Sequence, residues 1–138
     1  PLSAQDDVEL GPRIKAIRAQ HYTQKMDLSP EEAETFWPVF NEREKELLNV
    51  ARKKKAKKQQ IKNNMKVNTP KFMEKLLDEY ADLERQEAEI RRRYHDRFKE
   101  VLPIKKLAMF YQAEESWRER LIMQIMKRRQ RAAQQGGG

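Results

Sequence analysis

The sequence is poor in glycine and contains no cysteine. Three of its four glycines are the terminal Gly136, Gly137 and Gly138, so Gly11 is the only one inside the chain. A sheet protein of this size needs several tight turns with positive φ, which glycine adopts most easily, and phosphate-binding loops need glycine too. The shortage therefore argues against sheet folds and doubly wound folds. The missing cysteine excludes disulfides, zinc–thiolate sites and thiol catalysis.

Apolar residues are also scarce. They make up 38% of the 138 residues, and charged residues make up another 38%. Typical soluble domains carry roughly 45–50% apolar and about 25% charged residues. No run of 18 apolar residues occurs, so we expect no membrane-spanning helix. The composition favours an all-helical protein with a large exposed surface; a disordered chain is the alternative.

The two ends of the chain differ from its middle. The small residues around Leu2-Ser3-Ala4, followed by an acidic stretch, are typical of the end of a secretory signal, although an ordinary frayed terminus has the same composition. We therefore expect residues 1–11 to form a flexible N-terminus, with a candidate signal-peptide remnant at 1–4. Residues 12–133 are expected to form one helical domain, and residues 134–138 a disordered tail.

Proline marks the start of each predicted helix. Four of the six prolines stand just before an amphipathic stretch: Pro12, Pro30, Pro70 and Pro103. Proline is favoured at the first helical position, where its missing N–H is not needed. With apolar residues at helical spacing, these positions predict four helices, over residues 12–26, 30–62, 70–100 and 103–133. The expected fold class is all-α: four helices in an elongated, curved antiparallel layer.

The second helix has the most detailed start pattern. The Ser29 side chain can accept from the backbone N–H of Glu32, whose carboxylate can reach back, which makes a capping box. Thr69 predicts a simpler cap on the third helix. Pro38 lies inside the second helix, where its ring removes a backbone hydrogen bond and predicts a kink. A break into two separate helices at Pro38 is the alternative.

Three of the predicted helices are about 30 residues long, which corresponds to roughly 45 Å. A compact domain of this size has a radius of gyration of only about 14 Å. The helices therefore predict a thin layer with apolar residues on both sides. A second copy of the chain would cover them, so we expect a dimeric cradle.

The positive charge is concentrated in two short runs. The net charge is +8, residues 52–58 hold six basic residues, and residues 127–131 hold four. Without these ten, the chain has 20 basic and 22 acidic residues. Such runs attract anionic partners or form a solvated helix face. The candidate attracting residues are Arg52, Lys53, Lys54, Lys55, Lys57 and Lys58, and the candidate apolar contacts are Met65, Phe72 and Met73.

A weak internal repeat aligns residues 28–37 with residues 101–110. Each segment has an apolar residue two positions before a proline and a bulky pair six and seven positions after it. The offset of 73 residues predicts two helix-hairpin halves.

The first of these segments resembles the LTxxQ-type motif of the Spy and CpxP family of envelope stress proteins, in the form found in Bacteroidetes members. The resemblance extends over residues 13–126. It is carried by Leu28, Ser29, Pro30, Glu32, Phe36, Trp37 and Pro38 in the first segment, and by Leu102 and Pro103 in the second. Ser29 replaces threonine and Glu32 replaces glutamine, and both keep the capping chemistry. Leu102 replaces threonine in the second segment and has no capping hydroxyl.

The resemblance implies an exported, periplasmic, all-helical homodimer without enzymatic activity. Spy-like members are ATP-independent chaperones, and CpxP-like members restrain an envelope stress sensor. The expected partners are therefore unfolded client proteins or an envelope sensor protein. A zinc-binding branch uses His and Cys ligands, whereas this chain has only His21 and His95, on different predicted helices. Because a structural zinc site needs four ligands, we expect no metal and no cofactor.

Three other classes of protein are an enzyme, a nucleic-acid binder and a coiled-coil scaffold. Acidic residues lie at helical spacing from Lys and Arg, and no serine has a histidine nearby in the sequence, so we predict that the chain is not an enzyme. The two basic runs leave a basic helical nucleic-acid-binding protein as the alternative, although no helix-turn-helix register or interleaved aromatic residue supports it. A coiled-coil scaffold is the third class, and Glu87 interrupts its apolar stripe.

Overall fold

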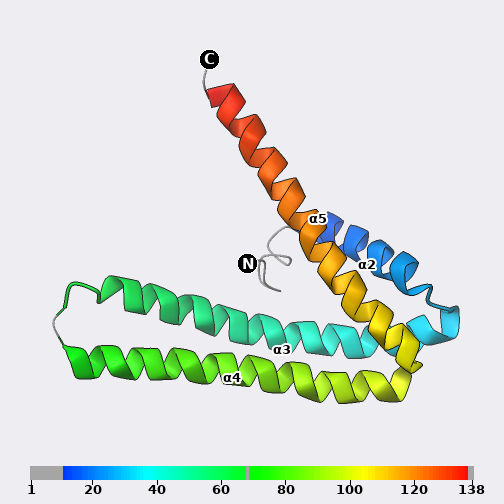
Figure 1. Cartoon of the computed structure of the whole chain (residues 1–138), viewed down its shortest axis with the longest axis horizontal. Coiled ribbons are helices and arrows are strands. Elements are labelled where there is room, and N and C mark those ends of the chain that lie inside the picture. Colours follow the sequence, from blue (N-terminus) through cyan, green and yellow to red (C-terminus); the bar gives the residue numbers. More distant parts are fainter. Residues whose placement is uncertain (1–10, 68, 137–138) are drawn as a thin grey trace.

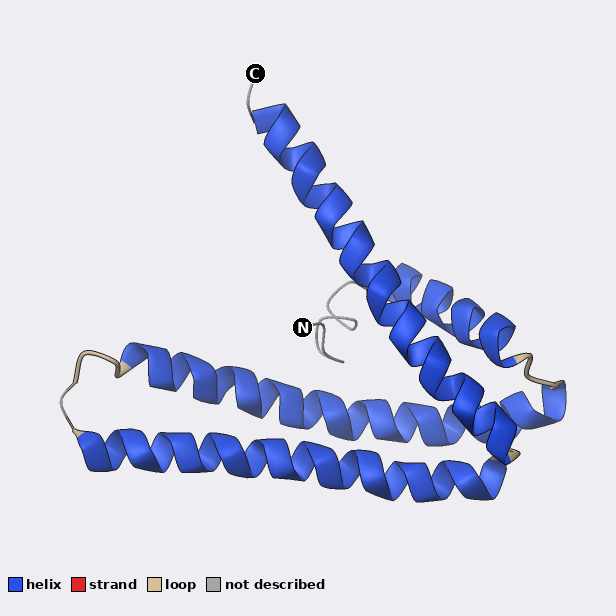
Figure 2. Cartoon of the chain, viewed as in Figure 1, coloured by secondary structure: helices blue, strands red, loops and turns tan. Residues whose placement is uncertain are grey.

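The structure is a computed structural model that describes residues 11–67 and 69–136. These residues form four helices and no strand (Figures 1 and 2). The helices are α2 (Pro12–Met26), α3 (Pro30–Asn63), α4 (Pro70–Val101) and α5 (Ile104–Gly136). The all-α, four-helix prediction is confirmed.

The predicted boundaries are wrong mainly at the C-terminal end. Helix α5 continues to Gly136, so residues 134–136 of the predicted disordered tail are helical. Residues 137–138 lie outside the described residues, as does the predicted flexible N-terminus apart from Gly11. Gly11 precedes α2 with a φ of 92°, a conformation that glycine adopts without strain.

The two predicted helix caps have different outcomes. At α3, Ser29 Oγ accepts from the Glu32 N–H at 3.1 Å, and Glu32 Oε1 accepts from the Ser29 N–H at 2.9 Å. The Ser29 N–H also lowers the pKa of the Glu32 carboxyl. At α4, the predicted Thr69 cap is wrong, because its side chain makes no capping hydrogen bond. Its backbone has φ −131° and ψ 79°, unlike the extended Ser29.

Helix α3 is continuous through Pro38, so the alternative of two separate helices is wrong. The helix also persists through the lysine-rich segment to Asn63. The kink, the curvature and the dimer stay predictions.

Helices α3 and α4 run antiparallel as one long hairpin (Figure 1). Helix α5 leaves the end of α4 obliquely, and α2 packs along the first half of α5. The outer half of the hairpin extends beyond the region where all four helices meet. We call this outer half, residues 51–87, the arm.

One aromatic ring from each helix meets at a junction near the base of the hairpin. Tyr22, Phe36, Phe98 and Phe110 are all fully buried. The Phe36 and Phe98 ring centroids are 5.5 Å apart, and Phe110 lies 5.3 Å from Phe36 and 4.9 Å from Phe98. Tyr22 meets Phe110 edge-on at 5.8 Å. Such contacts add to the large apolar area that aromatic rings bury. We call these four residues the aromatic junction.

A buried arginine lies beside the aromatic junction and joins α3 to α5. Arg43 is 3% exposed, and its guanidinium donates to both carboxylate oxygens of Glu114, at 3.0 and 3.1 Å. Burial opposes the charge of Arg43, but Glu114 and Glu44 outweigh it and raise the arginine pKa. The guanidinium also lies 5.4 Å from the Phe110 ring centroid.

The aromatic junction leads to a stability prediction. Phe36→Ala should lower the free energy of unfolding by about 3–5 kcal/mol, because it leaves a cavity among three rings. Phe72→Ala, on the arm, should cost about 1 kcal/mol or less, because that ring is already partly exposed. Urea denaturation followed by far-UV circular dichroism measures both. Equal costs for the two variants would contradict the junction as the main core.

Candidate functional site: the α3 surface and the arm

The structure divides the six predicted attracting residues between two environments. Lys57 Nζ lies 2.6 Å from Glu79 Oε2, and Lys54 Nζ lies 3.5 Å from Glu87 Oε2. The side chains of Lys54 and Lys57 are only 18% and 17% exposed. These two lysines therefore join α3 to α4, and their prediction as solvent-facing attracting residues is corrected.

The acidic partners lie on α4. Residues 70–90 contain seven acidic and three basic residues, and the α3 segment of residues 51–63 contains seven basic and no acidic residues. Because the helices are antiparallel, these segments face each other along the arm. Lys57 lowers the pKa of the Glu79 carboxyl through their hydrogen bond. Glu87, which interrupts the apolar stripe, also lies in this seam between the two helices.

The other predicted residues lie on the surface of the arm or near it. Arg52, Lys53, Lys55 and Lys58 are exposed, and we call these four residues the arm cations. At the tip, Met65 is 68% exposed and Phe72 is 38% exposed, whereas Met73 is half-buried. The sequence interpretation missed Val67 and Leu77, which are also exposed there. The arm therefore brings cations and apolar side chains to one part of the molecule.

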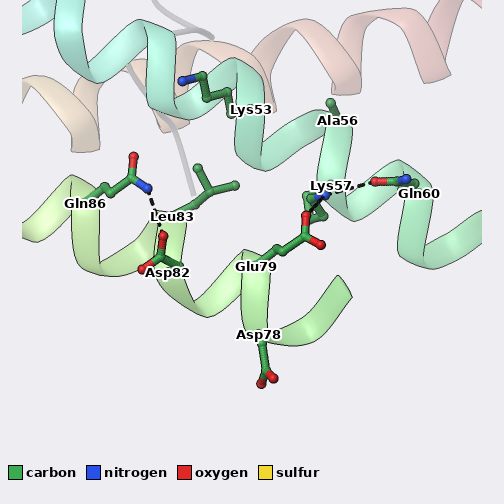
Figure 3. Close-up of a pocket in the computed structure, with 9 residues that line it drawn as sticks. All are labelled: Lys53, Ala56, Lys57, Gln60, Asp78, Glu79, Asp82, Leu83 and Gln86. Atoms are coloured by element: carbon green, nitrogen blue, oxygen red, sulfur yellow. Dashed lines mark hydrogen bonds and ion pairs between the residues drawn. The ribbon is translucent and has the colours of Figure 1, made fainter. Parts of the chain in front are cut away.

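A groove of about 590 Å³ runs along one side of the arm (Figure 3). Its lining residues are Lys53, Ala56, Lys57, Gln60, Asp78, Glu79, Asp82, Leu83 and Gln86. Figure 3 shows Lys57 bonded to Glu79 across the groove, and Gln86 donates to Asp82 at 3.0 Å. The lining contains both acidic and basic side chains, and several of them pair with one another inside the groove.

A second groove, of about 570 Å³, lies between α2 and α3. Lys15, Arg18 and Ala19 line it from α2, and Trp37, Phe40, Asn41, Glu44, Lys45 and Leu48 line it from α3. Trp37 is half-buried and stacks on Tyr22 at a centroid distance of 6.5 Å. We call this the Trp37 groove. Sequence periodicity assigned the apolar residues of this groove to a core stripe. No sequence pattern separated the half-buried positions from the fully buried ones.

The Trp37 groove and two of the arm cations lie on one face of α3. Leu48 in the groove is followed at helical spacing by Arg52 and Lys55, so these three positions share a face of the helix. Leu48 is half-buried, and the two basic residues are exposed. An extended ligand could therefore contact an apolar groove and a basic surface without leaving α3.

The motif residues that carry the family resemblance have structural roles. Leu102 is buried, Leu28 is half-buried, and Pro30 and Pro103 are exposed at helix starts. The two repeated segments lie against each other: Lys106 Nζ donates to the Asp27 carbonyl and lies 3.4 Å from Glu32 Oε1. Phe36 and Phe110 of the repeat meet in the aromatic junction. The repeat therefore marks the base of the fold.

Sequence reasoning also missed a buried histidine–serine contact. His21 Nε2 lies 2.8 Å from Ser116 Oγ, although 95 residues separate them. Ser116 Oγ donates to the Ala113 carbonyl at 3.1 Å, so it accepts from His21, and His21 Nδ1 faces Arg120 at 3.4 Å. A nucleophile–base pair needs the opposite arrangement, with the serine donating and a carboxylate at the second ring nitrogen. Burial, Arg120 and Lys25 lower the pKa of His21.

The other histidine lies elsewhere. His95 Nδ1 is 2.6 Å from Tyr111 Oη, and the two rings stack. Within residues 11–67 and 69–136, no group of three or more His, Cys, Asp or Glu side chains is placed to hold a metal ion. None of the described helices combines the length and the apolar character needed to cross a membrane.

Comparison with known proteins adds no relative. No family model matches the chain, and neither a curated protein nor a solved structure matches it.

The buried histidine makes stability depend on pH. Because the pKa of His21 is lower in the folded state, its contribution to stability is complete above the unfolded pKa of about 6.5 and is lost as the pH falls. Acidification from pH 7.5 to 5 should therefore destabilise the wild type more than His21→Gln, whose amide can replace both hydrogen bonds without titrating. Urea denaturation at both pH values measures the difference.

The matched control is His95→Gln, which removes the histidine that contacts Tyr111 instead. It tests whether the loss of a histidine in itself changes the pH dependence. If His21→Gln loses as much stability on acidification as the wild type, His21 is not the titrating group.

Proposed function

We propose that this chain is a non-enzymatic, Spy/CpxP-like protein of the cell envelope that binds unfolded or partner polypeptides. The activity is that of an ATP-independent chaperone or of a modulator of an envelope stress sensor. The periplasmic location and the family rest on the resemblance of residues 28–38. One observation of the structure supports polypeptide binding most strongly: the Trp37 groove and the arm cations lie along the same helix, α3.

The two surfaces suit different parts of one ligand. Unfolded chains expose acidic and apolar groups together. Arg52 and Lys55 would attract acidic segments over distances of about one Debye length, roughly 8–10 Å at physiological salt. The Trp37 groove, which Leu48 helps to line, would then receive an apolar side chain. Binding of this kind is adaptable, because neither surface requires a fixed ligand sequence.

The exposed apolar tip supports a second copy of the chain as a further partner. Met65, Val67 and Phe72 lie at the end of a thin two-helix arm, where one chain has little core of its own. A homodimer that covers this tip would leave the Trp37 groove near the other end of α3 open to ligands. We therefore propose a homodimer as the working form.

The charge contribution is testable with a variant that removes four cations, Arg52→Gln/Lys53→Gln/Lys55→Gln/Lys58→Gln, called the arm variant. At low salt, about tenfold more arm variant than wild type should be needed to slow the aggregation of an unfolded acidic client. The difference should shrink as salt is added, because screening weakens the attraction. Light scattering of a chemically denatured client after dilution measures this effect.

The matched control removes four cations at the other basic run, Lys127→Gln/Arg128→Gln/Arg129→Gln/Arg131→Gln, called the tail variant. It should protect the client as well as the wild type does. Equal loss in both variants would mean that net charge alone matters. A wild-type protein that protects no client would leave only the sensor-modulating role, which requires an envelope partner.

A further inference from the structure

The last part of α5 extends away from the other helices (Figure 1). Helix α2 packs against α5 near Leu121 and Ile125, where Ile14 and Ile17 line a small groove with them. Every described residue after Ile125 is exposed. We call residues 118–136 of α5 the tail helix. The part after Ile125 is too short to be stable as an isolated helix in water, so an external surface that binds one face would stabilise it.

The tail helix carries uncovered apolar side chains. Ile122, Met123 and Met126 are 40%, 57% and 58% exposed. At 100° per residue, Ile122 and Met126 lie on one face with Ala133, and Met123 lies at the edge of that face. This face points away from the side of α5 on which Trp117 and Leu121 are buried.

The end of the tail helix carries only positive charge. Lys127, Arg128, Arg129 and Arg131 are exposed, and no acidic residue follows Glu119. Among the described residues no ion pair involves these four cations, whereas Lys54 and Lys57 of the other basic run are paired with α4. Lys127 and Arg131 lie on the face opposite Ile122 and Met126, whereas Arg129 lies beside Ile122 and Arg128 lies on the side of α5 that faces α2. The tail helix therefore has a narrow apolar strip at Ile122 and Met126 with basic residues around it.

We infer that the tail helix binds the surface of an anionic lipid bilayer. A helix with an apolar face and Lys or Arg on its polar face lies in the membrane interface, with its apolar side chains inserted between headgroups. An anionic bilayer offers negative charge to the four cations and an apolar layer to Ile122 and the methionines. The segment contains no aromatic residue, so it offers no stacking surface for nucleic-acid bases. This inference does not depend on the proposed binding of polypeptides.

The experiment uses the full chain and vesicles that contain equal amounts of phosphatidylglycerol and phosphatidylcholine. The wild type should co-sediment with them at low salt and should not co-sediment with vesicles of phosphatidylcholine alone. Each cation near an anionic surface contributes about fivefold in affinity. The tail variant should therefore bind at least about 100-fold more weakly. The arm variant, which loses the same charge, should bind within a few-fold of the wild type.

A polarity-sensitive dye attached to one residue can locate the part of the chain that contacts the membrane. Because the chain has no cysteine, Met123→Cys provides a single site for a polarity-sensitive dye, and Ala81→Cys on α4 provides the matched control site. The dye at position 123 should shift to the blue when anionic vesicles are added, and the dye at position 81 should not. Ile122→Ser/Met126→Ser should weaken binding without a change of charge.

Several results would overturn the inference. Absence of wild-type binding to anionic vesicles at low salt is one, and equal weakening in the arm and tail variants is another. A blue shift at position 81 but not at position 123 would place the contact on the arm. Binding of a DNA duplex that needs the tail cations, without any binding to vesicles, would assign the tail helix to nucleic acid. Client protection measured in parallel is independent of all of these outcomes.

Discussion

The aromatic junction is the constraint on which the rest of the structure depends. It is the only place where all four described helices contribute a fully buried ring. Because Phe36, Phe98 and Phe110 each come from a different helix, their packing fixes where α3, α4 and α5 meet. The long helices then extend from this point as semi-independent parts. A surface on the arm or the tail helix keeps its position relative to the others only while the junction is intact.

Charge pairing adds to apolar packing away from the junction, where Leu76 and Leu83 are still buried on the arm. Arg43 and Glu114 still lie close to the rings, where burial makes a paired charge costly to break. Further along α3, Lys54 and Lys57 pair with Glu87 and Glu79 across the arm. These pairs are more exposed, and exposed pairs contribute little each. The arm is therefore held by a few buried apolar side chains and by ion pairs that each contribute little.

Much of the fold could be predicted because its determinants are local. Proline at helix starts, the Ser29–Glu32 capping box and apolar spacing each act within a few residues, so one sequence suffices. The direction in which a lysine of a uniform basic run points is not local, since it depends on the acidic residues of the next helix. That acidic excess was present in the sequence, but it becomes informative only once the helices are known to be antiparallel. The contact of His21 with Ser116 has no local pattern at all.

The candidate surfaces were less predictable than the fold for the same physical reason. Periodicity places Trp37 and Leu48 among core residues, but whether such a residue is covered depends on where α2 begins. Likewise, the basic runs at residues 52–58 and 127–131 look equivalent in composition. One lies against an acidic helix and is partly neutralised, whereas the other lies on the last part of α5, where every described residue after Ile125 is exposed. A neighbouring helix, rather than the composition of a charged run, therefore decides how much of its charge remains available to a partner.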